Sequence, residues 1–345
     1  MTRTHRKKVL LLMSGGTLGM DGKRPTPLHP GTYLRNLVQV VPEIGEIADV
    51  ESDILFNLDS SNIGPTHWSQ LAERIGDSIL SRAAPDGIVL IHGTDTMAYT
   101  ASALSFMLPG IDRPVVLTGS QRPLQEIRSD ARQNLLNAVE LATMNIPEVT
   151  VCFGSRLFRG NRVTKVDSWR YGAFESPGMP PLAELGVTVD ISDEIRYPKS
   201  PFRVQNTVDS RVMVVWVTPG LNPQTIVAGV RAANIRGLVV AAFGSGNLTT
   251  EPPAMLEALT SIVNDGVTVV VTSQTLRGGV DLTLYDCGAA LLRLGAIPAG
   301  DMTLEATVTK LMWALANTDS PTDVNRVMQQ NIAGELTHEA HGHAT

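Results

Sequence analysis

The chain has 345 residues, of which 43% are hydrophobic and 18% charged, with 28 Lys and Arg against 34 Asp and Glu. This composition excludes a disordered or collagen-like chain, and the length suggests two domains or one large one. The net charge of −6 comes without a basic run that could follow phosphates, so nucleic acid is not an expected partner. Cys152 and Cys287 have no neighbour at metal-ligand spacing, and we interpret both as small buried hydrophobic residues.

A short basic segment opens the chain and is followed by an apolar run over residues 9–13. This run is shorter than the usual h-region of a signal peptide, about 7–15 residues, and no cleavage site of small residues follows it. We therefore expect a retained first strand and a cytoplasmic protein. Later apolar stretches do not approach the roughly 18 residues of a membrane span, so no membrane association is expected.

Short strands rich in Val, Leu and Ile recur along the chain, each closed by a small or polar turn. Strands of this kind are predicted over residues 9–13, 88–91, 115–117, 149–152, 212–217, 239–243 and 267–271. Helices are predicted over 97–108 and 129–144. Uniformly apolar strands are typical of a parallel sheet covered on both faces. The sequence therefore predicts an α/β fold with mostly parallel sheets.

A Pro-rich, charged segment over residues 197–210 interrupts this alternation. We predict a larger N-terminal α/β domain over 1–196, a linker over 197–211 and a smaller C-terminal α/β domain over 212–345. Ligands of open parallel sheets bind beyond the carboxyl ends of the strands. The polar residues that follow the predicted strands are therefore the candidate functional residues.

Two of these polar turns carry threonines. Ser14-Gly15-Gly16-Thr17 combines a tight glycine turn with a hydroxyl, and by itself such a turn is more often a plain connection or a phosphate cradle than a nucleophile site. His92-Gly93-Thr94-Asp95-Thr96 sets a hydroxyl beside a carboxylate. In isolation Asp95 is best interpreted as a helix N-cap. His92 is interpreted as a hydrogen-bonded structural residue rather than a metal ligand.

A basic loop, Arg159-Gly160-Asn161-Arg162-Val163-Thr164-Lys165, follows the strand predicted over 149–152. Three positive charges this close are typical of a solvated face or an anion site. A lysine gains further chemistry where burial lowers its pKa from about 10.4, because it can then accept a proton near neutrality.

Taken together and in this order, the motifs resemble those of the bacterial-type L-asparaginase family, especially its type I, cytoplasmic branch. The similarity runs from near residue 8 to about residue 337. The matching stretches are residues 14–20, 59–61, 92–108, 118–137, 157–165, 301–311 and 334–337. The resemblance implies a larger N-terminal and a smaller C-terminal α/β domain, with the active site at the carboxyl ends of the N-domain strands.

The resemblance also implies hydrolysis of the side-chain amide of free L-asparagine to L-aspartate and ammonia. It assigns Thr17 as the nucleophile that forms an acyl-enzyme, and Thr94, Lys165 and Asp95 as a proton-handling triad. It implies that the substrate is bound by Asp59, Ser60, Ser61, Thr94 and Asp95. It requires no metal and no organic cofactor.

Family members are homodimers or homotetramers whose sites draw on adjacent subunits, so the resemblance implies a homo-oligomer. Asn247 is a candidate second-domain contribution, because the loop over 244–247 matches a segment that approaches a neighbouring subunit's site in relatives. The chain also departs from the family. The flap after the first motif normally carries a tyrosine, whereas residues 20–31 contain none and Tyr33 lies beyond the matching position. Residues 274–276 lack a cysteine found there in an asparagine-regulated relative.

Two alternatives stay open. One is a related amidohydrolase that acts on L-glutamine or D-asparagine, or that uses glutamine as the ammonia donor of a tRNA-dependent amidotransferase. The other is a non-catalytic amino-acid sensor on the same fold, which the missing flap tyrosine favours. The histidines at 338, 341 and 343 are interpreted as part of a flexible terminus rather than a metal site.

Overall fold

The computed structural model describes residues 6–21, 29–30, 37–250 and 253–337. The chain divides into two compact units, residues 1–206 and 207–345. This division falls within the segment predicted as the linker. Residues on its two sides are bonded to different units: the Gln205 N–H donates to Met107 O at 2.8 Å, and the Asp209 N–H donates to Met312 O at 2.8 Å.

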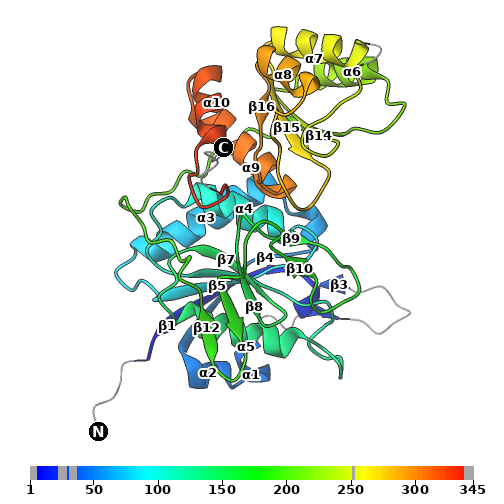
Figure 1. Cartoon of the computed structure of the whole chain (residues 1–345). Helices are drawn as coiled ribbons and strands as arrows, with labels where there is room; N and C mark the ends of the chain where they lie inside the picture. Colours follow the sequence, from blue (N-terminus) through cyan, green and yellow to red (C-terminus); the bar gives the residue numbers. More distant parts are fainter. Residues whose placement is uncertain (1–5, 22–28, 31–36, 251–252, 338–345) are drawn as a thin grey trace. The chain divides into compact units, whose positions relative to one another are not determined.

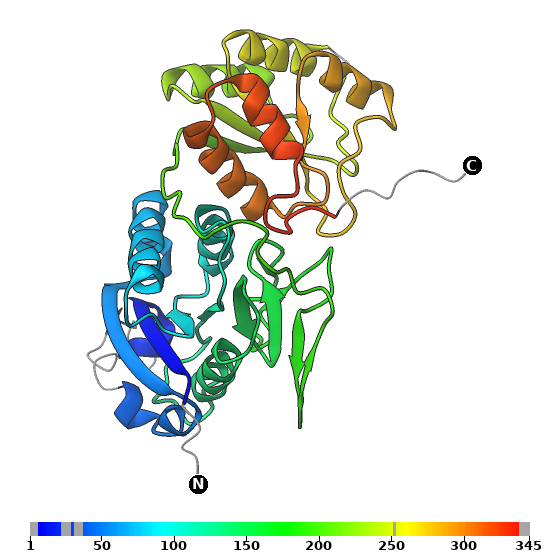
Figure 2. The ribbon, with the colours of Figure 1, turned by 90° about the vertical axis from the view of Figure 1, so that its left-hand side faces the viewer.

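The described part of the first unit contains a mixed sheet of eight strands in the order β12-β11-β8-β7-β6-β5-β1-β4. The strands are β1 (Lys8–Gly15), β4 (Asp49–Leu58), β5 (Gly87–Ile91), β6 (Val115–Thr118), β7 (Val149–Phe153), β8 (Arg156–Arg159), β11 (Ala183–Leu185) and β12 (Val189–Ile191). The pairs β4–β1, β1–β5, β5–β6 and β6–β7 are parallel. The pairs β7–β8, β8–β11 and β11–β12 are antiparallel. Figure 2 shows the two edges of this sheet, β4 in blue and β11 and β12 in green.

Helices cover both faces of this sheet (Figure 1). One face carries α1 (Leu37–Val40), α2 (Ile44–Ile47) and α5 (Ala131–Ala142), and the other carries α3 (Pro65–Leu80) and α4 (Met97–Met107). Val9, Leu11 and Met13 alternate along β1 and pack in the same hydrophobic cluster as Leu135 and Val139 of α5. Every residue of β5 is apolar and buried, as expected for a central strand with both faces covered.

The local sequence explains where α3 begins and which side it buries. Pro65 occupies the first turn, where its missing N–H has no intrahelical partner to lose. Trp68, Leu71, Ala72 and Ile75 recur at intervals of three and four residues and are buried. The helix is therefore fixed by one apolar stripe that faces the sheet.

The described part of the second unit has its own parallel sheet, in the order β13-β14-β15-β16. Its strands are β13 (Val212–Trp216), β14 (Gly237–Ala242), β15 (Thr268–Ser273) and β16 (Ile297–Pro298), and its helices are α6 (Pro223–Ala232), α7 (Ala254–Asn264), α8 (Asp286–Arg293), α9 (Leu304–Asn317) and α10 (Pro321–Gln329). Helices α6, α7 and α8 share a hydrophobic cluster with the strands, and α9 and α10 lie on the other face (Figures 1 and 2).

A buried ion pair fixes the last described segment to α9. Lys310 and Glu335 both have fully buried side chains, and the Lys310 Nζ lies 2.6 Å from Glu335 Oε1. The same ammonium donates to Met328 O at 3.0 Å. Glu335 in turn accepts the N–H groups of Ile332 and Ala333 at 2.9 and 2.7 Å. Both charges are thus compensated in the interior.

The predicted α/β fold with mostly parallel sheets is confirmed. Each strand and helix predicted from the sequence is present, and each end lies within two residues of its prediction. The predictions omitted β4, one of the two edge strands of the first sheet, in which exposed and partly buried residues intermingle and the apolar run is lost. They also omitted β8, β11, β12 and β16, and of the helices they covered only α4 and α5. None of the helices in the described ranges is long and apolar enough to cross a membrane.

Candidate active site

Four parallel strands of the first unit end in polar turns at the same edge of the sheet. Thr17 follows β1, Asp59 follows β4, and Thr94 and Gln121 come within three residues of the ends of β5 and β6. Because β4, β1, β5 and β6 are consecutive and parallel, their carboxyl ends meet at one edge. These four residues therefore belong to one region of the molecule.

Close backbone contacts draw three of these turns together. Gly16 has a φ of +94°, in the left-handed region that favours glycine. A Cβ on Gly16 would lie 2.4 Å from the nitrogen of Gly93, and a Cβ on Gly93 would lie 2.5 Å from Ser60 Oγ. Only glycine fits at these two positions without displacing a neighbour. The turns that carry Thr17, Thr94 and Ser60 are therefore in direct contact.

Lys165 joins this edge from β9 (Thr164–Lys165), which pairs antiparallel with β10 (Phe174–Glu175). Its Nζ donates to Thr94 Oγ1 and to Asp95 Oδ1, each at 2.7 Å. The Lys165 side chain is 19% exposed, whereas Asp95 is 66% exposed. A hydroxyl and a carboxylate that both contact one amine can exchange protons through it.

The helix-cap interpretation of Asp95 is wrong. Helix α4 begins at Met97, and its N-cap residue is Thr96. The Thr96 hydroxyl does not cap the helix but donates to Ser60 O at 2.6 Å. Asp95 is therefore left to pair with Lys165.

Asp59, Ser60 and Ser61 form the turn after β4, which continues into a short 3₁₀ helix, η3 (Ser60–Asn62). Asp59 Oδ1 accepts the Ser61 hydroxyl at 2.7 Å and the Ser61 N–H at 2.8 Å. These two hydrogen bonds, the hydroxyl first, hold the pKa of Asp59 below its ordinary value. Asp59 and Ser61 are exposed and Ser60 is buried. The turn thus presents a charged carboxylate at the sheet edge.

His92 is a structural residue, as predicted. Its Nδ1 lies 2.7 Å from Gly93 O, and its Nε2 lies 2.9 Å from Thr100 Oγ1, which accepts the Trp68 indole N–H at 3.1 Å. A carbonyl only accepts, so Nδ1 carries the proton and Nε2 accepts from the threonine. Complete burial lowers the pKa of His92 to about 4, which keeps the ring neutral.

Sequence reasoning missed Gln121, which bonds to two groups at the site. Its Oε1 accepts the Thr94 hydroxyl at 3.2 Å, and its Nε2 donates to Arg170 O at 3.1 Å. The turn that carries it is fixed by α5: the Gln121 N–H donates to the Asp130 carboxylate at 3.0 Å, and Asn134 Nδ2 donates to Gly119 O at 3.0 Å. The only signal in the sequence was the position of Gln121 after a strand.

The basic loop over 159–165 was predicted to be a solvated face or an anion site, and its first arginine, Arg159, fits neither prediction. Arg159 is 6% exposed and forms a two-point ion pair with Glu148, 2.6 Å from Nε to Oε2 and 3.0 Å from its second nitrogen to Oε1. Arg162 and Asn161 are also buried. The loop therefore runs through the interior of the unit before Lys165 emerges at the sheet edge.

The two cysteines lie outside this arrangement. Cys152 is buried in β7, and burial raises the pKa of its thiol to about 12, which makes it unreactive. The prediction that Cys287 is buried is wrong: it is only partly buried, and its sulfur accepts the Leu248 N–H at 3.4 Å. Among the described residues there is no group of three or more His, Cys, Asp or Glu that could hold a metal ion.

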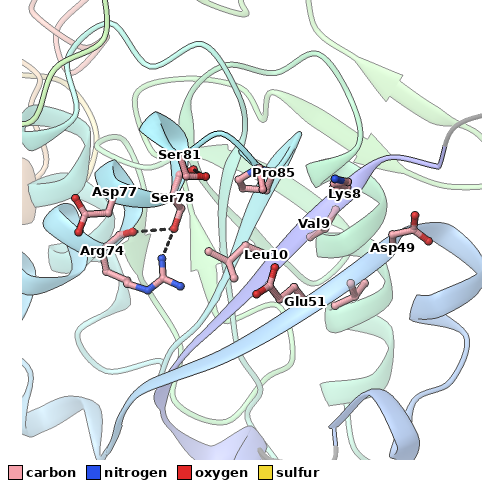
Figure 3. Close-up of a pocket in the computed structure, with 12 residues that line it drawn as sticks. Lys8, Val9, Leu10, Asp49, Glu51, Arg74, Asp77, Ser78, Ser81 and Pro85 are labelled. Atoms are coloured by element: carbon pink, nitrogen blue, oxygen red, sulfur yellow. Dashed lines mark hydrogen bonds between the residues drawn. The ribbon is translucent and has the colours of Figure 1, made fainter.

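A cavity of about 620 Å³ lies at the other end of the sheet (Figure 3). It is lined by the first residues of β1 and β4, among them Lys8 and Glu51, and by Arg74 and Ser78 near the end of α3. The lining residues of β1 and β4 are at the amino ends of these two strands. The cavity is therefore separate from the edge that carries Thr94 and Lys165.

Two further sequence predictions concern residues outside this edge. Asn247 belongs to the second unit, where its N–H donates to Phe243 O at 2.8 Å across a tight turn. The flap without a tyrosine includes residues 22–28, and Tyr33 lies within 31–36; all of these are outside the described residues. The terminal histidines at 338, 341 and 343 are outside them as well.

The sequence and the fold match those of known proteins. Residues 8–197 match the N-terminal asparaginase family model, and residues 211–328 match the glutaminase/asparaginase C-terminal domain. An L-asparaginase from Thermococcus kodakarensis is 38% identical over 332 residues, which is 96% of this chain and 99% of that protein. L-asparaginase 1 of Escherichia coli K12 is 36% identical over 343 residues, 96% of this chain and 99% of the relative. The solved structure of the thermostable L-asparaginase from Thermococcus kodakarensis has a TM-score of 0.88 at 37% identity, covering 96% of this chain and 100% of that one.

An α/β amidohydrolase is the class of protein that this fold and these matches define. The chain belongs to the L-asparaginase family, and its similarity extends over its whole length to type I members.

Proposed function

We propose that this protein hydrolyses the side-chain amide of free L-asparagine to L-aspartate and ammonia. The observation that carries the proposal is the contact of Lys165 Nζ with Thr94 Oγ1 and Asp95 Oδ1, each at 2.7 Å, at the sheet edge where Thr17 follows β1. A nucleophilic hydroxyl needs a base within hydrogen-bond reach, and we assign that role to this triad. The full-length similarity to L-asparaginases supports asparagine as the amide.

In the first half of the reaction, Thr17 Oγ1 attacks the amide carbon and a new C–O bond forms, while the Thr17 hydroxyl proton passes to the Thr94–Lys165 pair. The carbon–nitrogen bond then breaks, and the nitrogen leaves as ammonia after it takes up that proton from the pair. The product is an ester between Thr17 and the aspartyl group. Backbone N–H groups near Thr94 and Asp95 would stabilise the oxyanion, a contribution of about 3 kcal/mol per donor in other enzymes.

In the second half, water attacks the ester carbon and the bond to Thr17 Oγ breaks. The water proton passes to the Thr94–Lys165 pair, which returns a proton to Thr17 Oγ1. Free L-aspartate is released. Asp95 holds Lys165 in contact with Thr94 during both halves.

We propose that the remaining polar groups bind the amino-acid part of the substrate. The Asp59 carboxylate, which its bonds to Ser61 keep charged, complements an α-ammonium group. The Ser60 and Ser61 hydroxyls, with Thr94 and Asp95, complete the proposed binding set. A binding site for both charged groups would select free asparagine over an asparagine within a peptide.

Three features are proposed from family membership. The compartment is the cytoplasm, as the similarity to type I members supports. The active form is a homodimer or homotetramer. Asn247, in the turn after β14, is proposed to contribute to a site in that assembly.

Ammonia release from L-asparagine tests the proposal. The wild-type protein should release ammonia and aspartate in equal amounts, and Thr17→Ala should abolish release while the circular dichroism spectrum stays unchanged. Thr260→Ala, at an exposed threonine of α7, is the matched control and should keep full activity.

The same assay separates the alternatives. A higher kcat/KM for L-glutamine or D-asparagine would reject L-asparagine as the preferred amide. Tight binding of aspartate without turnover of any small amide would reject the enzyme and favour an amino-acid sensor.

A further inference from the structure

Gln121 is fixed in one orientation by the groups around it. Its Nε2 lies 3.1 Å from Arg170 O, and a carbonyl oxygen only accepts hydrogen bonds, so the nitrogen of the amide must face Arg170. The oxygen of the amide then faces Thr94. The opposite orientation would bring two oxygens together at Arg170.

Both ends of this contact are held by further bonds. The Gln121 N–H donates to Asp130 Oδ1 and Oδ2 at 3.1 and 3.0 Å. On the other side, Asp167 Oδ1 accepts the N–H groups of Trp169 and Arg170 at 2.6 and 2.9 Å, which shapes the turn that presents Arg170 O. The position of the Gln121 side chain is therefore determined by two separate loops.

The Thr94 hydroxyl has a single proton, and this geometry assigns it. Gln121 Oε1 can only accept, so Thr94 donates its proton to Gln121 at 3.2 Å. The contact between Thr94 and Lys165, at 2.7 Å, must then use a lone pair of the Thr94 oxygen and a proton of Lys165. In this arrangement Lys165 is a donor, and Thr94 cannot donate to it.

We propose that Gln121 is a positioning residue that holds the Thr94 hydroxyl away from the Lys165 nitrogen, and so sets the pH at which Lys165 can become the proton acceptor of the pair. For Lys165 to accept the proton, the Thr94 hydroxyl must turn from Gln121 toward the lysine, and the bond to Gln121 must break. The consequence for catalysis rests on the function proposed above, whereas the hydrogen-bond order does not.

Two substitutions at Gln121 should act in opposite directions. Gln121→Met has a similar length but no acceptor, so it frees Thr94 to donate to a neutral Lys165, and Lys165 should lose its proton at a pH lower by about 0.5–1 unit. Gln121→Glu provides a stronger acceptor and a negative charge, so Lys165 should lose its proton at a higher pH. A merely structural residue would not give shifts of opposite sign.

The experiment is an NMR titration of protein with labelled lysine side chains. The chain has six lysines, and Lys165→Met identifies the signal of Lys165. Gln133→Met, at an exposed glutamine of α5 that bonds to Asn137, is the matched control and should leave the Lys165 midpoint unchanged. In parallel, the acid limb of the pH profile of kcat/KM for L-asparagine should move with the Lys165 midpoint in each variant.

The outcomes are distinct. A Lys165 midpoint that is the same in the wild type and in Gln121→Met overturns the inference, as does a shift to higher pH in that variant. Should Gln121→Met fail to fold, an unchanged or lowered midpoint in Gln121→Glu overturns it. Shifts in the expected directions in a wild type and variants that release no ammonia support the inference and reject the proposed function.

Discussion

Gly16 and Gly93 are in backbone contact, although 77 positions separate them in the sequence: a Cβ on Gly16 would lie 2.4 Å from the Gly93 nitrogen and 2.6 Å from its Cα. The neighbours that would have to move are main-chain atoms, which cannot turn aside as a side chain can. This contact brings the turn with Thr17 against the turn with Thr94. The geometry of the proposed active site therefore depends on an absent side chain.

Gly16→Ala should lower ammonia release by at least tenfold, because it pushes the Thr17 turn away from the Thr94 turn and strains a residue with φ of +94°. Steady-state kinetics with L-asparagine measure the effect. Gly45→Ala is the matched control, since a Cβ there meets no atom within 4 Å. Equal activity in the two variants would show that the contact does not control the site.

Lys165→Met should reduce kcat by about 10²–10⁴, the usual contribution of a general acid or base. Its effect on stability should be small, within about 1 kcal/mol, because its partner Asp95 is 66% exposed and remains solvated. Lys199→Met, at an exposed lysine, is the control for loss of one positive charge. Turnover by Lys165→Met within threefold of the wild type would remove Lys165 from the mechanism.

Two arginines at the ends of β8 should differ in their contribution to stability. Arg159→Met leaves the Glu148 charge buried without its partner and should cost about 3–5 kcal/mol of unfolding free energy. Arg156→Met removes an exposed pair with Glu184, 3.5 Å apart, and should cost less than about 1 kcal/mol. Urea unfolding of the two variants measures the difference. Similar costs would mean that burial of the Arg159 pair does not govern its energy.

The neutral His92 should make the fold sensitive to mild acid. Burial lowers the pKa of His92 from 6.5 to about 4, so the unfolded chain binds a proton that the folded chain does not. The stability linked to His92 is fully present above pH 6.5 and is lost as the pH falls toward 4, amounting to about 2 kcal/mol between pH 7 and 5.

His92→Gln isolates this effect. The variant should be less stable than the wild type at pH 7, because Thr100 and Gly93 lose the partner that satisfies them both. The difference between the two proteins should then shrink toward pH 5. Urea unfolding at several pH values measures it, and a difference that does not depend on pH would contradict a neutral, buried His92.

The central elements of both sheets could be predicted from local pattern. Strands such as β5 and β14 are apolar at every position, because both of their faces are covered. Strand β4 escaped prediction because it lies at the edge and carries Asp49, Glu51 and Asp53 among its ten residues. Its pattern reflects exposure to solvent on one side, which periodicity alone does not separate from a loop.

The residues of the candidate site likewise divide into those that local sequence could indicate and those that only the tertiary structure could. Thr17, Thr94 and Asp95 became candidates because they follow apolar strands, and the family resemblance assigned roles to them and to Lys165. Local sequence favoured a helix cap for Asp95, and only the tertiary structure paired it with Lys165, 70 positions away, at 2.7 Å. Gln121 has no local signal for its contact with Thr94, because that contact depends on the alignment of β5 and β6.

The amino-acid composition of the chain excluded disordered and collagen-like proteins. The order of polar turns after apolar strands predicted the α/β fold and placed threonines at the carboxyl ends of the strands. Hydrophobic periodicity is a local property, since each residue's preference for water or the interior is its own. Which hydroxyl faces which amine, and which arginine is buried, depends on contacts between segments far apart in the chain. Those contacts, from Gly16 against Gly93 to Gln121 against Thr94, were decided only by the tertiary structure.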